Sequence, residues 1–167
     1  MNLADVLEDE ILPCVQKPSR YLGTEVNAVH KPLDGIDVRI ALAFPDLYDL
    51  GLGNLGVHIL YACLNKLDWA CCERVYAPAL DMEEQLRSRG LPLFALESKD
   101  SLDQFDLLGV TLQSELTYTN ILNILELSGI PLRTDDRTDE HPLTCAGGPA
   151  VFNPEPLAPF MDFFVIG

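Results

Sequence analysis

Three short stretches, each at the end of an apolar run, combine residue types that suit a ligand site. They are Asp46, Tyr48 and Gly51 in the spacing D-x-Y-x-x-G, Thr111 to Gln113 in the order T-L-Q, and the pair Gly147 and Gly148. Glycine reaches positive φ angles and lets a backbone approach a ligand closely. These stretches predict a crevice that binds a ligand, and the alternative is a set of tight turns that binds nothing.

The remaining residues offer little catalytic chemistry. Asp46 and Asp49 could serve as a metal or acid–base pair, but two acids in an exposed loop are more often solvated or cap the next helix. None of the five cysteines forms a C-x-x-C pair, and Cys71 and Cys72 lie in an apolar run that predicts buried, reduced thiols. His58 falls among apolar neighbours at helical spacing, which predicts a half-buried side chain. We therefore assign no catalytic residue and no metal site.

Apolar runs alternate with stretches of helical spacing along most of the chain. We expect buried strands at 38–44, 70–77, 106–112, 142–148 and 162–167, and a short extra strand at 92–96. Helices are expected at 54–67, 81–89 and 117–129, with Asp81 capping the second and Gly129 ending the third. The alternation predicts an α/β fold, a flavodoxin-like, doubly wound parallel five-stranded sheet of order 2-1-3-4-5. Ligands bind beyond the carboxyl ends of the strands in such sheets, where the three stretches would meet.

The first 36 residues form a separate extension. Residues 3–15 predict a short amphipathic helix with Asn2 as its N-cap, and residues 16–36 predict an extended lead-in. The α/β domain would then occupy 37–167. A parallel sheet needs cover on both faces, and no closing helix follows the last predicted strand. We therefore expect a fragment of a longer protein.

Charge and hydropathy exclude two classes of partner. The formal net charge is −15, from 26 acids against 11 bases, which argues against direct contact with nucleic acid. No apolar run approaches the roughly 20 residues of a membrane span. The first residues carry acids rather than the basic start of a secretory signal. We expect a cytoplasmic protein with no membrane partner.

The three stretches resemble the signature of the flavodoxin-like domain that binds cobalamin in its base-off form. That domain has D-x-H-x-x-G after strand 1, S-x-L at strand 3 and G-G after strand 4. Five longer segments bring the chain closer to the N-terminal part of an uncharacterised group of radical S-adenosylmethionine (radical SAM) proteins. The segments are RYLGTEVN, FPDLYDLGLGNLGVHILY, ERVYAPALDMEEQL, SELTYTNILNILELSGIPLR and AGGPAVFNPEPLAPFMDFFVIG. This resemblance covers nearly the whole chain from residue 20 onward.

The resemblance implies a cofactor- or substrate-binding module that is not catalytic by itself. It implies cobalamin as the cofactor and the catalytic barrel of the parent chain as the partner. The implied cofactor-binding residues are Asp46, Tyr48, Gly51, Thr111, Gln113, Gly147 and Gly148. The 4Fe–4S cluster and S-adenosylmethionine would be bound by the parent protein outside this sequence, which has no C-x-x-x-C-x-x-C motif.

Tyr48 departs from the cobalamin pattern. It stands where the family has the histidine that ligates cobalt from below, and a phenol with a pKa of about 10 is a poor ligand at neutral pH. The alternative is therefore a degenerate module that binds no cofactor and serves as an interaction or packing domain for the barrel.

Overall fold

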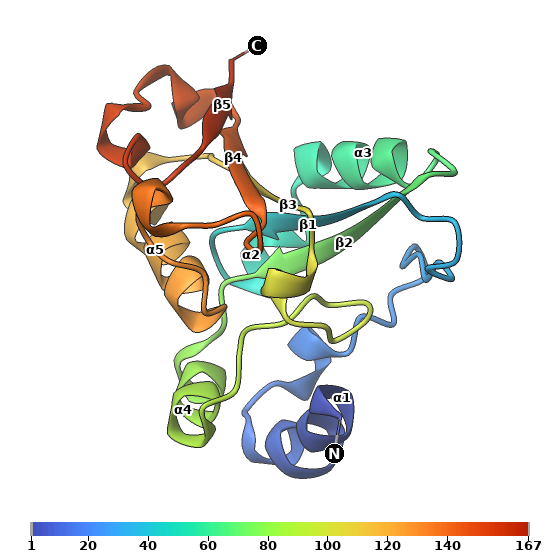
Figure 1. Cartoon of the computed structure of the whole chain (residues 1–167). Helices are drawn as coiled ribbons and strands as arrows, with labels where there is room; N and C mark the ends of the chain where they lie inside the picture. Colours follow the sequence, from blue (N-terminus) through green and yellow to red (C-terminus); the bar gives the residue numbers. More distant parts are fainter. Residues whose placement is uncertain (1, 167) are drawn as a thin grey trace.

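In the computed structural model, which describes residues 2–166, five parallel strands form one sheet of order β2-β1-β3-β4-β5 (Figure 1). The strands are β1 (Val38–Phe44), β2 (Ala70–Tyr76), β3 (Leu107–Thr111), β4 (Leu143–Gly147) and β5 (Phe163–Val165). Each lies within two residues of its predicted bounds. The predicted flavodoxin-like α/β fold is confirmed. The strand order reverses between β1 and β3, so the switch point of the sheet lies at their carboxyl ends.

The helices divide unequally between the two faces of the sheet. Helix α3 (Leu55–Leu64) buries Val57 and Tyr61 in a small core with residues of β1 and β2. Helices α4 (Leu80–Arg89) and α5 (Tyr118–Leu127) bury Met82 and Ile121 in a larger core with residues of β3 and β4. Right-handed crossovers that run in opposite directions from β1 require this division. In the part of the chain that the structure describes, α3 is the only long helix on its face.

Local signals account for two of the three long helices. The side chain of Asn54 accepts a hydrogen bond from the Val57 amide at 3.0 Å and caps α3. Gly129 adopts a φ of 72° just after α5, as predicted for a C-terminal glycine, and the Ile130 amide bonds back to the Leu125 carbonyl at 3.0 Å.

Two local predictions are wrong. Ala79, not Asp81, is the N-cap of α4, because the helix begins one residue earlier than expected. Asp81 instead accepts the backbone N–H of Gln16 at 2.7 Å, a contact with the N-terminal segment. Residues 92–96 form no strand of the sheet, since only Phe94 makes an isolated bridge, with Ser101. The Ala95 amide bonds to the Asp100 carbonyl instead, and only the Leu96 amide bonds to the sheet, which is too little pairing for a strand.

The N-terminal segment is helical from Leu3 to Cys14, close to the predicted 3–15. It comprises α1 (Leu3–Val6), a π-helical turn (Leu7–Ile11) and a 3-10 turn (Leu12–Cys14). Leu7 and Ile11 are fully buried in the larger core. The lead-in is less extended than predicted, because it contains a 3-10 turn at Pro18–Tyr21. No helix within residues 2–166 is long and apolar enough to cross a membrane.

Strand β2 lies at the edge of the sheet, yet all seven of its residues are buried. Its outer edge is closed by side chains and a loop rather than by another strand. The amide group of Asn65 bonds both backbone groups of Cys72, at 2.9 and 3.0 Å. The Arg74 amide donates to Glu97 at 2.7 Å, and its carbonyl accepts from the Leu96 amide at 2.7 Å. Cys71 and Cys72 are buried thiols, as predicted.

Candidate functional site

Tyr48, the first residue of the single-turn helix α2 (Tyr48–Gly51), is engaged by the lead-in. Its hydroxyl donates to Glu25 at 2.5 Å, and its ring meets the Tyr76 ring edge-on, with centroids 5.2 Å apart. Burial and the neighbouring Glu25 carboxylate raise the pKa of Tyr48 further above its ordinary value of 10. Tyr48 is therefore a neutral phenol, and its hydroxyl hydrogen is already used in a hydrogen bond within the chain.

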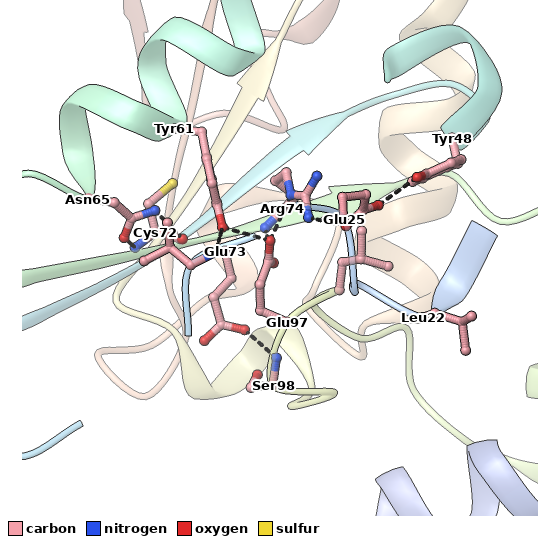
Figure 2. A network of polar contacts seen from close by, with 12 residues as sticks. Leu22, Glu25, Tyr48, Tyr61, Asn65, Cys72, Glu73, Arg74, Glu97 and Ser98 are labelled. Atoms are coloured by element: carbon pink, nitrogen blue, oxygen red, sulfur yellow. Dashed lines mark hydrogen bonds and ion pairs between the residues drawn. The ribbon is translucent and has the colours of Figure 1, made fainter. Parts of the chain in front are cut away.

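Figure 2 shows that this hydrogen bond belongs to a network centred on Arg74 of β2. Arg74 donates to Glu25 at 2.7 Å and to Glu97 at 2.6 Å, and Glu97 also accepts from Tyr61 of α3 at 2.9 Å. Arg74 and Glu97 are almost completely buried. The network joins the lead-in, the loop after β1, β2 and α3, so it fixes the position of the loop that carries Tyr48.

The pKa values of the two carboxylates in the network shift in opposite directions. Burial raises the pKa of Glu25, but hydrogen bonds from Tyr48 and Arg74 outweigh it and lower the pKa below its ordinary value of 4.5. Burial is stronger at Glu97 and raises the pKa there in spite of Arg74. Glu25 is thus the carboxylate that the network holds ionised.

The other two predicted residues of this loop also serve the fold. A Cβ atom on Gly51 would lie 2.4 Å from the Tyr76 ring and 2.7 Å from the Phe44 ring, so the glycine is required by aromatic packing. Asp46 accepts the backbone N–H of Leu47 at 2.7 Å and lines a polar crevice of about 460 Å³ with Arg20. The structure therefore does not bring Asp46, Tyr48 and Gly51 together around one cavity.

The four remaining predicted residues do line one cavity. A groove of about 660 Å³ lies between α3 and strands β1, β3, β4 and β5. Thr111, Gln113, Gly147 and Gly148 lie along it. Its other walls are mainly apolar and include Leu42, Leu60, Leu64 and Val165. The hydroxyl of Thr111 is already used, because it donates to the Ala43 carbonyl at 3.2 Å.

The glycines at the groove have different structural reasons. Gly148 has a φ of 119°, and a Cβ there would lie 2.6 Å from the Leu112 carbonyl, so the turn itself needs glycine. Gly147 and Gly109 lie within strands, and a Cβ on either would meet ordinary contacts of 3.6 Å or more. Glycine weakens a strand interior, and it often marks a place where a ligand or another backbone approaches closely. Gly109 was not among the predicted site residues.

Sequence reasoning also missed Glu25, Arg74, Glu97 and Lys99. The adjacent charges Glu73 and Arg74 inside the apolar run ACCERVYA were the available signal for a buried ion pair. Lys99 is buried with a left-handed φ of 65°, and its ammonium donates to the carbonyls of Leu22 and Leu96 at 2.9 and 2.6 Å. No sequence pattern indicated that this lysine fastens the lead-in to the loop before β3.

The cysteine at the groove is not activated as a nucleophile, and the histidine of α3 is hydrogen-bonded to the backbone. Burial raises the pKa of the Cys145 thiol, which lines the groove, so this thiol stays protonated at neutral pH. His58 is half-buried on α3, as predicted, with Nε2 2.5 Å from the Leu52 carbonyl oxygen. Among residues 2–166 no three His, Cys, Asp or Glu side chains gather as metal ligands would.

Comparison with known proteins places the chain in a family. The family model for the N-terminal part of radical SAM proteins matches residues 56–167, which include all but the first residue of α3 and four of the five strands. An uncharacterized protein of Methanocaldococcus jannaschii is 28% identical over 129 residues, covering 77% of this chain and 23% of that protein. This chain thus spans about a quarter of the length of that relative. No solved structure matches this chain. The chain belongs to the family of radical SAM N-terminal domains.

Proposed function

We propose that this domain holds a flat organic ligand of the cobalamin type, or part of a substrate, beside the catalytic barrel of a radical SAM protein. The observation that carries the proposal is the groove of about 660 Å³, along which Thr111, Gln113, Gly147 and Gly148 lie together. The module is not catalytic by itself, since the groove presents no nucleophile next to a base.

The groove suits one part of such a cofactor. Its body is apolar, and two strand glycines lie along it where their own packing leaves room for a side chain. Its carboxyl-edge end is polar, with Gln113 and the N-cap Asn54 of α3. A planar, mainly apolar group with a polar end would fit there, because glycine allows close approach and the amides offer hydrogen bonds.

The loop after β1 does not suit the cobalt centre. The hydroxyl of Tyr48 is donated to Glu25, and its raised pKa disfavours the phenolate that a metal would need. A corrinoid in the groove would therefore have no lower ligand from Tyr48. The 4Fe–4S cluster and S-adenosylmethionine would be held by the catalytic part of the parent protein.

A second candidate is a packing domain that binds no cofactor. It is favoured by the same loop, in which Tyr48 and Gly51 are used for internal contacts. In that case the groove would be covered by other parts of the parent protein.

Titration with hydroxocobalamin separates the two candidates. The ligand-binding proposal predicts a shifted visible spectrum and co-elution of the corrinoid with the purified protein. Gly147→Val should abolish this binding, because the new side chain fills the groove, while Gly53→Val outside the groove should leave it unchanged.

A titration in which no corrinoid binds would decide against cobalamin. A specific site with a binding free energy of about −8 kcal/mol has a Kd near 1 µM, so no binding at about 100 µM would rule out the cobalamin proposal. Binding that survives Gly147→Val would show that the site is not the groove.

A further inference from the structure

Each of the four connections that follow β1 to β4, counted to the first residue of the next long helix or strand, exposes a large apolar side chain at the carboxyl edge of the sheet; we call them the carboxyl-edge loops. They are Leu50 at 61%, Leu80 at 86%, Leu116 at 90% and Phe152 at 77% of full exposure. Single exposed apolar residues are normal on protein surfaces. One on every loop of the same edge is a pattern that points to an interaction surface.

The opposite edge of the sheet provides a comparison within the same molecule. Its most exposed large apolar side chains at the starts of the strands are Trp69, just before β2, at 48% and Leu143, the first residue of β4, at 58%. Both are less exposed than any of the four at the carboxyl edge. The same strands form both edges, so the difference in exposure comes from the connecting segments and not from the sheet.

Carboxylates without an ion-pair partner among the described residues accompany three of these apolar side chains, whereas Asp49 beside Leu50 is paired with Lys17 and Arg20. Asp81 follows Leu80, Glu115 precedes Leu116, and Glu155 lies in the loop with Phe152. None of the three forms an ion pair within residues 2–166. Apolar side chains with acids beside them suit a partner surface that has apolar pockets bordered by Lys and Arg, since complementary charge steers and aligns an interface.

We propose that the carboxyl-edge loops, with Leu50, Leu80, Leu116 and Phe152, dock on the catalytic part of the same radical SAM protein. The family to which this chain belongs is the N-terminal part of such proteins, and the matched relative is about four times as long as the aligned region. A surface on the catalytic part of the same chain would be tethered to this domain, so its effective concentration at the carboxyl edge would be high. The inference rests on the proposed place beside a barrel and is independent of whether cobalamin binds.

Hydroxyl-radical footprinting of the full-length protein tests this docking directly. Oxidation of each side chain is measured by mass spectrometry and normalised for the intrinsic reactivity of its residue type. We expect Leu80, Leu116 and Phe152 to lose most of their oxidation and to fall below Trp69 and Leu143, which reverses their order of exposure in this domain.

Substitutions on the two edges give a matched control. Leu116→Arg combined with Phe152→Arg should restore oxidation at Leu80 by opening the interface, and Leu143→Arg on the other edge should not. If the double variant fails to fold, the wild-type footprint still decides the question. Oxidation of the four carboxyl-edge residues in proportion to their exposure here would overturn the proposal, whatever the outcome of the cobalamin titration.

Discussion

The loop after β1 and the loops after β3 and β4 lie at the same edge of the sheet, but they are built in opposite ways. In the first, Tyr48 bonds to Glu25 and Gly51 packs beneath the rings of Phe44 and Tyr76. In the others, Gly147 and Gln113 line an open, mainly apolar groove. The chain itself fills the space at one loop and leaves it free at the others.

Glycine at the two loops therefore has two different structural causes. Gly51 is a glycine because its own neighbours leave no room for a Cβ atom. Gly147 is a glycine although its neighbours would accept a Cβ at 3.6 Å. Only the second kind indicates something outside this chain, and substitutions can separate the two.

Removal of Arg74 should have the largest effect. Arg74→Met removes the buried cation that Glu25 and Glu97 share, and breaking a buried ion pair by removing one partner costs about 3–5 kcal/mol. We expect that loss in the free energy of unfolding, measured by urea denaturation. Arg87→Met, which removes an exposed arginine paired with Glu83 and Glu126, is the control and should cost much less, because solvent screens exposed ion pairs. Equal losses in the two variants would contradict the central role of Arg74.

Alanine at the two glycines should give clearly different results. Gly51→Ala forces the packed Tyr76 ring to move, and overpacking of this kind costs about 1–3 kcal/mol. Gly147→Ala should change the stability by no more than about 0.5 kcal/mol, because the new methyl group makes ordinary contacts. Thermal unfolding of both variants checks this pair. A stable Gly51→Ala protein would mean that the loop after β1 has free space after all.

Tyr48→Phe should have a smaller effect. It removes the hydrogen bond to Glu25 but keeps the ring against Tyr76, so we expect a loss of about 1 kcal/mol. Glu25 remains bonded to Arg74, so the lead-in should stay in place. Hydrogen exchange of residues 22–31 measures this, and full loss of protection there would show that Tyr48 alone holds the lead-in.

The contribution of Glu25 to stability should depend on pH. Its pKa is lowered in the folded state, so its stabilising effect is present above pH 4.5 and is lost as the pH falls through the folded-state pKa. The difference in unfolding free energy between wild type and Glu25→Gln should therefore shrink on acidification. A difference that grows toward low pH would contradict the ionised state assigned to this carboxylate.

The sequence was sufficient for the fold because the relevant signals are local and repeated. Every strand lies in a mainly apolar run, and the alternation with helices leaves only a few topologies with right-handed crossovers, of which the order 2-1-3-4-5 is a common one. The prediction of Asp81 as a helix cap was wrong because α4 begins one residue earlier, which leaves its carboxylate to accept the amide of Gln16, 65 residues away in the chain. The strand predicted at 92–96 was wrong because apolar character alone does not provide a pairing partner.

The candidate site was predictable only in part for the same reason. Composition and spacing by themselves determined the α/β class, the order of the strands and the edge at which Thr111, Gln113, Gly147 and Gly148 meet. Only the tertiary structure decided that Glu25 of the lead-in takes the hydroxyl of Tyr48 and that aromatic rings fill the space above Gly51. Periodic burial is written into neighbouring residues, whereas a hydrogen bond between positions 25 and 48, or a ring packed on a glycine, exists only once the chain has folded.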